Sequence, residues 1–131
     1  LCAELITLYL ARDLNPGEQR SSANMEGFLA SLWDKVSANL KRDWRVHELA
    51  PEVGVSPSHF HRVVRQYNGD TPLNMVLKIR MEKAQELFLT QDYPLHVVAE
   101  IVGYDNPFAF SAAFKRIVGV NPSEFGKKRH P

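Results

Sequence analysis

Disulfide bonds within the chain are excluded, because the 131 residues contain a single cysteine, Cys2. Long apolar runs are missing too. The longest, at residues 5–11, is far shorter than the roughly 20 residues of a membrane span, and it lacks the basic flank of a signal peptide. We therefore expect no disulfide framework, no membrane contact and a location in the cytoplasm.

Catalytic and metal-binding patterns are equally absent. The sequence has no nucleophile beside a base, no phosphate-binding loop and no metal-ligand spacing. His59 and His61 are two positions apart, and on a helix such residues point about 200° from each other, so they do not easily share one ion. These absences predict that the protein is not an enzyme and binds neither a cofactor nor a metal.

A strong charge of one sign is also lacking. The net charge is +1, which by itself says little about a polyanionic partner. The charge is uneven, however, with a balance of −2 over residues 1–40 and +3 over residues 41–131. With 44% hydrophobic and 24% charged residues, the chain has the composition of an ordinary folded protein, and its length fits one domain.

Residues 1–23 are predicted to form a short helix, at about 2–12, and a linker rich in turn-forming residues, at 13–22. Because the first residue is Leu1 rather than Met, we expect this part to be the end of a missing sensor or dimerisation domain. Asn24 is suited to cap the helix that follows. The apolar stripe of that helix, with Trp33 in the core, consists of Phe28, Leu29, Leu32, Trp33, Val36 and Leu40.

An internal repeat is the most informative feature of the sequence. The apolar and glycine pattern of residues 46–55 returns 49 residues later, at 95–104, with its spacing kept. Such a match is not expected by chance and indicates a duplicated structural unit. After one inserted residue, Phe60, Val64, Arg65, Gly69 and Pro72 return at an offset of 50 as Phe110, Phe114, Lys115, Gly119 and Pro122.

Each copy predicts a helix-turn-helix. A short helix ends at a glycine that can adopt a positive φ, Gly54 in the first copy and Gly103 in the second. A second helix then follows a capping residue and a proline, and the capping residues are Ser56 and Asn106.

We place the two units at about 46–67 and 95–118. The segment between them predicts one long linker helix at 72–90, because it has no glycine and no internal proline. Nineteen residues at about 1.5 Å each span roughly 28 Å. That length can hold the units about one turn of DNA apart, since successive major-groove faces are separated by roughly 34 Å. The predicted fold is all-α, with two homeodomain-like helix-turn-helix subdomains joined by this helix.

The doubled pattern resembles the AraC/XylS family of bacterial transcription regulators, whose DNA-binding domain has two helix-turn-helix units and a linker helix. The resemblance covers about residues 24–126. Matching residues in the first unit and the linker are Leu49, Ala50, Gly54, Ser56, Pro57, Phe60, Gly69, Arg80 and Ala84. In the second unit they are Val98, Ala99, Glu100, Val102, Gly103, Tyr104, Phe110, Ser111, Phe114 and Lys115, and then the run from Gly119 to Phe125.

The resemblance implies a sequence-specific regulator that binds double-stranded DNA and inserts two recognition helices into successive major grooves of a promoter. Residues 24–131 would be the DNA-binding domain, RNA polymerase would be recruited or blocked, and any dimerisation would occur through the missing N-terminal domain. The alternative is a helical protein-interaction module without sequence-specific DNA binding. That alternative explains the apolar helices but neither the duplicated caps nor an outward-facing Arg62.

The first recognition helix is predicted to bury one stripe, formed by Phe60, Val63, Val64 and Tyr67, and to expose the opposite one. By resemblance, positions 58, 61 and 62 face base edges. Arg62 can donate two hydrogen bonds to guanine O6 and N7, a pairing worth roughly 1–3 kcal/mol of discrimination, although it can also contact only phosphate. The candidate DNA-binding residues of this helix are Ser58, His59, His61, Arg62, Arg65 and Gln66.

The second recognition helix is predicted to bury Phe110, Ala113, Phe114 and Ile117. Its outward face has few bidentate donors, and Ala112 stands where the family often has a polar or charged residue. Phe108 can contact a thymine methyl, whereas Lys115 suits phosphate. We therefore expect the first unit to read sequence tightly and the second loosely. The candidates are Asn106, Pro107, Phe108, Ser111, Ala112, Lys115 and Arg116.

Other basic residues have less specific expected roles. Arg42, Arg45 and the tail 127–129 can attract phosphate in a salt-dependent way or can simply be solvated. Arg80 lies on the predicted linker helix, and we interpret it as structural rather than base-reading.

Overall fold

The computed structural model describes residues 16–129, and side chains within that range are described for residues 24–126. These residues form helices and turns without any strand, which confirms the all-α prediction, and no helix among them is long and apolar enough to cross a membrane. In chain order the elements are α2 (Pro16–Ala38), α3 (Val46–Leu49), the 3-10 helix η1 (Ala50–Val53), α4 (Pro57–Asn68), α5 (Pro72–Thr90), α6 (Leu95–Ile101), α7 (Pro107–Val118) and α8 (Pro122–Arg129).

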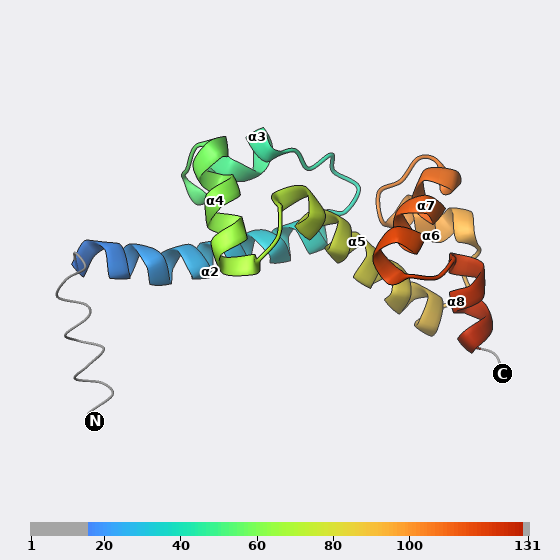
Figure 1. The fold of residues 1–131 in the computed structure, drawn as a ribbon. Coiled ribbons are helices and arrows are strands. Elements are labelled where there is room, and N and C mark those ends of the chain that lie inside the picture. The colour runs from blue at the N-terminus through green and yellow to red at the C-terminus, as the bar shows by residue number, and fades with distance from the viewer. Residues whose placement is uncertain (1–15, 130–131) are drawn as a thin grey trace, which may run out of the picture.

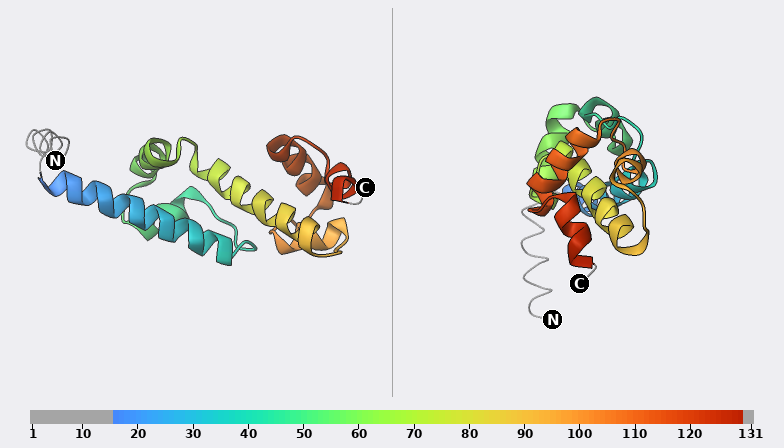
Figure 2. Two further views of the ribbon diagram at one scale, coloured as in Figure 1. Left: turned by 90° about the horizontal axis from the view of Figure 1, so that it is seen from below. Right: turned by 90° about the vertical axis from the view of Figure 1, so that its right-hand side faces the viewer.

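Two groups of helices follow one another along the molecule, and α5 runs from one into the other (Figure 1; Figure 2). α5 packs against α2 and α4 of the first group and against α6, α7 and α8 of the second. It spans Pro72–Thr90, the residues predicted to form the linker helix, and the Thr71 hydroxyl caps it by accepting from the Asn74 N–H at 3.2 Å. A single continuous helix therefore carries both groups.

The first group is held together by apolar side chains of α2, α3, η1, α4 and the segment between α2 and α3. Trp33 of α2 is half-buried against this core, with its ring 6.4 Å from that of Phe60. Its Nε1 also donates to Oδ1 of Asn68 at 3.2 Å, so both contacts fix α4 on α2. The buried residues of this group are Leu29, Leu32, Val36, Leu40, Trp44, Leu49, Ala50, Val53, Phe60, Val63 and Val64.

Aromatic rings dominate the core of the second group. The ring of Phe114 lies 5.7 Å from that of Phe88, 5.7 Å from that of Phe110 and 5.6 Å from that of Phe125. Such ring pairs are worth about 0.5–1.5 kcal/mol beyond the area they bury. Phe125 belongs to α8, a helix that the sequence analysis did not predict, and this contact makes α8 part of the second group.

The start of α2 differs from the prediction. Residues 16–22, expected to be a linker, are helical, and Asn24 lies inside the helix instead of capping it. Proline is compatible with the first helical turn, and an internal glycine costs only about 1 kcal/mol, so these residues do not prevent a helix. Phe28 belonged to the predicted apolar stripe but is 53% exposed. The helix predicted at 2–12 lies outside the described residues.

Candidate nucleic-acid interface

Both helix-turn-helix turns have the backbone that the repeat predicted. Gly54 has φ 73° and Gly103 has φ 99°, values that favour glycine because a Cβ is strained there. The Ser56 hydroxyl accepts from the His59 N–H at 3.3 Å, and the Asn106 Oδ1 accepts from the Phe108 N–H at 2.8 Å. α4 and α7 therefore begin with the same combination of a capping side chain and a following proline.

α4 has the two faces expected of a recognition helix. Phe60, Val63 and Val64 are buried, and Tyr67 packs partly against the same core, which confirms the predicted stripe. The opposite face is free of the core, so its polar side chains are available to a ligand. All six candidates of this helix are exposed: Ser58, His59, His61, Arg62, Arg65 and Gln66.

α7 repeats this arrangement with a different surface. Phe110 and Phe114 are fully buried, and Ala113 and Ile117 pack against the core, as predicted. Phe108 is 84% exposed, more than any other large apolar side chain in the described part of the chain. Of the candidates, Asn106, Phe108, Ala112, Lys115 and Arg116 are exposed, whereas Pro107 and Ser111 are half-buried.

Asn106 differs from the other candidates because its side chain already has a structural partner. Its Oδ1 is occupied by the Phe108 N–H, so the cap holds the first turn of α7 in place. Without a cap of this kind a helix or protein loses about 0.5–2 kcal/mol of stability. The side chain thus orients Phe108 whether or not it also meets a ligand.

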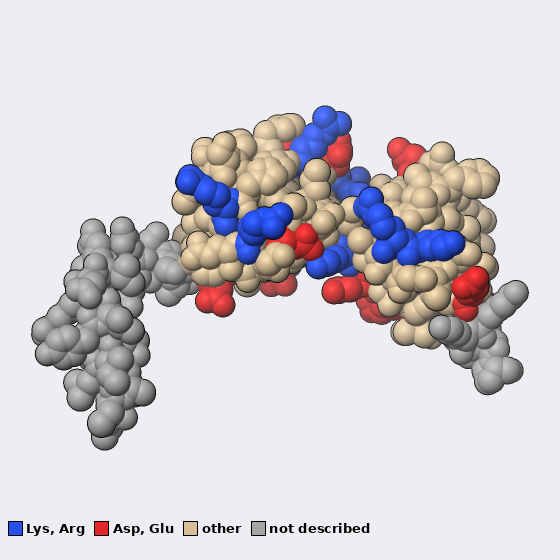
Figure 3. Space-filling model, in the orientation of Figure 1, with Lys and Arg blue, Asp and Glu red and all other residues tan. Residues whose placement is uncertain are grey.

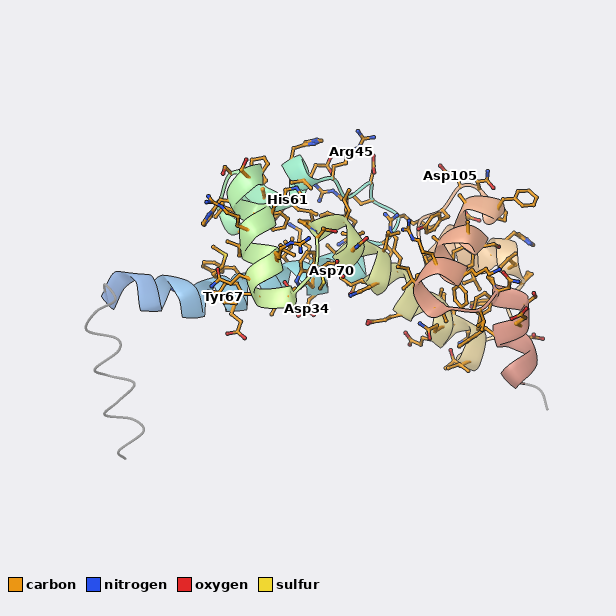
Figure 4. All side chains as sticks on the ribbon, in the orientation of Figure 1. Asp34, Arg45, His61, Tyr67, Asp70 and Asp105 are labelled. Carbon is orange, nitrogen blue, oxygen red and sulfur yellow. The ribbon has the colours of Figure 1, made fainter. Side chains whose placement is uncertain are left out.

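Charge is distributed unevenly over the surface. Figure 3 shows Lys and Arg side chains over α4 and over α7 on one face of the molecule, whereas most of the visible Asp and Glu side chains lie along its lower edge. Asp34 marks that lower edge, and His61 lies on α4 above it (Figure 4). Neither α4 nor α7 carries an acidic residue in its first turn, so no carboxylate within either helix offsets the positive end of its dipole. This face suits a polyanion.

The other basic residues named from the sequence are partly engaged within the protein. Arg45 pairs with Asp43 at 2.8 Å on the surface, and the Arg42 guanidinium lies 4.3 Å from the centre of the Trp44 ring. Arg80 donates from Nη2 to the Arg42 carbonyl at 3.0 Å, in agreement with a structural role. The side chains of 127–129 lie outside the described ones.

Carboxylates fix the segments that flank α4. The hydrogen bond from Lys35 lowers the pKa of Glu52 and ties η1 to α2 at 2.8 Å. After α4, Asp70 accepts from Lys78 at 2.6 Å and from the side chain of Asn74 at 3.0 Å. These hydrogen bonds hold the pKa of Asp70 at about 2, below its ordinary value of 3.8. The turn that joins α4 to α5 therefore depends on a charged carboxylate.

Asp70→Asn should lower the melting temperature near neutral pH, and the difference from the unsubstituted protein should shrink as the pH falls from about 4 to 2. The direction of this change follows from the pKa of Asp70. Because folding lowers that pKa from 3.8 to about 2, the carboxylate stabilises the folded protein above pH 3.8, and this stabilisation is lost as the pH falls toward about 2. Thermal unfolding followed by circular dichroism tests this. Asp92→Asn, at an exposed position after α5, is the matched control. A pH-independent difference would contradict the assignment.

Family comparison places this geometry among known proteins. A family model described as a helix-turn-helix domain matches residues 49–128. An AraC-like transcription regulator of Streptomyces antibioticus is 34% identical over 121 residues, which cover 86% of this chain. The chain spans 39% of that regulator's length.

Solved structures of domains from transcription regulators are similar to this chain as well. The C-terminal domain of AraT, a response regulator from Geobacillus stearothermophilus, is 34% identical, with a TM-score of 0.71, covering 78% of this chain and 85% of that one. The DNA-binding domain of AdpA, a global transcriptional factor solved in complex with a target DNA, is 29% identical, with a TM-score of 0.71, covering 76% and 90%. Both similarities extend over most of the described residues.

Proposed function

This chain belongs to the AraC-type helix-turn-helix family of DNA-binding transcription regulators, which are not enzymes, and from that premise we propose that it reads a two-box promoter site. In this proposal α4 enters one major groove and α7 enters the next, on the same side of the duplex. Residues 24–131 form the DNA-binding domain.

The main support for this proposal is the duplicated, capped helix with an exposed outer face. α4 and α7 each bury one apolar stripe, so packing fixes each helix while its outer side chains stay outside the core. Lys and Arg side chains lie over both helices on one face (Figure 3). Basic side chains on one helix of each unit match the phosphates that flank two successive grooves.

We further propose that the two boxes are read with different stringency. The outer face of α4 offers Arg62 and His61, which can hydrogen-bond to base edges. The outer face of α7 offers the ring of Phe108 and the methyl of Ala112, which suit apolar contact with thymine. Lys115 and Arg116 lie nearer the end of α7 and suit phosphate. The first box is therefore sharp and the second is degenerate.

Selection of binding sites from a random duplex pool, at a stated salt concentration, tests the proposal. We expect two enriched boxes about one helical turn apart, with higher information content in the box bound by α4. Lys83→Ala, on α5 outside both recognition helices, should select the same site. A folded chain that enriches no sequence would instead favour the helical protein-interaction module, and a sharper second box would contradict the assignment of stringency.

Partners beyond DNA follow from the same proposal. A promoter-bound regulator recruits or blocks RNA polymerase, and a chromosomal target implies a location in the cytoplasm. The relative from Streptomyces antibioticus is more than twice as long as the matched region. We infer that a sensor or dimerisation function resides in sequence outside residues 24–131, so any dimer would form through that sequence.

A further inference from the structure

The two helix-turn-helix units touch each other directly, beside α5. A Cβ placed on Gly103, in the turn of the second unit, would overlap the carbonyl oxygen of Leu40, in the turn that follows α2 of the first unit. The same Cβ would lie 3.4 Å from the guanidinium carbon of Arg80. Gly103 is therefore required for more than its φ of 99°, because the absent side chain lets the backbones of the two units meet.

The equivalent turn in the first unit provides an internal comparison. Gly54 has a similar role and a φ of 73°, but a Cβ placed there would meet nothing within 4 Å. The close approach is thus a property of the second turn alone. A helix-turn-helix does not in general require such a contact, so the contact at Gly103 indicates a role in joining the units.

Arg80 connects the same elements from the side of α5. Its Nη2 donates to the Arg42 carbonyl of the first unit at 3.0 Å, and its guanidinium carbon lies 5.7 Å from the centre of the Tyr104 ring in the second unit. Arg42 in turn approaches Glu48 of α3, with Nε 3.8 Å from Oε2. One guanidinium therefore contacts both units, and it is positioned between the segment after α2 and the turn before α7.

We propose that Arg80 is a positioning residue, which fixes the orientation of α7 relative to α4 together with the contact of Gly103 on Leu40. The protein therefore discriminates between DNA sites by the distance between their two boxes as well as by the sequence of each box. This inference rests on the proposed two-box function. One added base pair rotates the second box by about 35° and moves it by about 3.4 Å. Because long helices curve gently rather than staying straight, α5 alone would hold the two units less rigidly than α5 together with this backbone junction.

Binding of duplexes whose boxes are separated by the selected spacing, or by one base pair fewer or more, tests the proposal. Arg80→Met keeps an apolar stem but removes the guanidinium. We expect Arg80→Met to lower the affinity ratio between correct and altered spacing by about tenfold, while binding to an isolated first box is unchanged. Arg80→Lys, which keeps a donor and the charge, should retain part of the ratio. Lys83→Ala, one turn along the same helix face, should retain all of it.

A second pair of variants addresses the backbone contact. Gly103→Ala and Gly54→Ala both place a side chain at a positive φ, so both should destabilise the protein. Only Gly103→Ala also separates the units, so only this variant should broaden or shift the preferred spacing. Equal spacing preference in Gly103→Ala, Gly54→Ala and the unsubstituted chain would overturn the role assigned to the junction.

A measurement without DNA separates this inference from the proposed function. Amide residual dipolar couplings of α4 and α7 should fit one alignment tensor in the unsubstituted protein and two different tensors in Arg80→Met. One shared tensor in Arg80→Met, with undiminished spacing discrimination, would overturn the inference while leaving two-box binding intact. Failure of the unsubstituted protein to select any site would instead overturn the proposed function. The part of the inference that concerns spacing would then be overturned as well.

Discussion

Phe110→Ala is expected to destabilise the protein by about 3–5 kcal/mol, because a large ring at a site that does not collapse leaves a cavity. Phe110 is fully buried, and its ring lies 5.7 Å from Tyr104, 5.7 Å from Phe114 and 6.3 Å from Phe88. These partners come from α5, from α7 itself and from the turn before α7. Loss of the ring should therefore loosen the whole second unit and abolish recognition of the second box.

Phe108→Ala is the matched control, since it removes the same atoms from the same helix two residues earlier. Phe108 is 84% exposed, so its loss should change the free energy of unfolding by no more than about 0.5 kcal/mol. Urea denaturation of both variants gives this comparison, and binding to the second box should weaken in both. A similar loss of stability in Phe108→Ala and Phe110→Ala would contradict the division of α7 into a buried and an exposed face.

The parts of the fold that could be predicted are those determined by local sequence patterns that occur in both copies of the repeat. Ser56 and Asn106 precede prolines, and a glycine stands at each turn, so cap, turn and helix start could be placed without any long-range information. The same repeat contains an overlooked signal. Pro72 begins α5, and Pro122, its counterpart 50 residues later, begins α8. The repeat already includes this proline, and reading it as a helix start in both copies would have predicted the last helix.

The parts that could not be predicted depend on contacts between distant segments. Residues 16–22 have the composition of a linker, and their helical state is set by the long helix they continue. The repeat predicts the turn at Gly103 but not its contact with Leu40, because no local pattern reveals that Leu40 lies against it. The sequence indicates a structural role for Arg80 but not its partners, the Arg42 carbonyl and Tyr104, because these come from different units. Exposure of candidate side chains follows from the periodicity of α4 and α7, whereas the identity of the bases they meet does not.

Arg62→Ala is expected to weaken binding to the selected site by about 5- to 150-fold, which corresponds to the roughly 1–3 kcal/mol of a bidentate contact with guanine. Recognition helices contact base edges mainly with their N-terminal residues. Arg62 is exposed in the first half of α4, which begins at Pro57. The loss should be confined to sites that carry the preferred base at one position, so specificity at that position relaxes and binding to unrelated duplexes changes little.

Arg65→Ala is the control for a contact that carries no sequence information. Arg65 lies in the last turn of α4 on the same exposed face, where phosphate is the expected partner. Its removal should weaken binding to all duplexes by a similar factor and reduce the slope of log affinity against log salt by about 1. Affinities of both variants for the selected site and its single-base variants, at several salt concentrations, distinguish the two roles. If Arg62→Ala behaved as Arg65→Ala does, with a uniform loss and a reduced salt slope, then Arg62 would contact phosphate, and base reading by α4 would fall to His61 and Ser58.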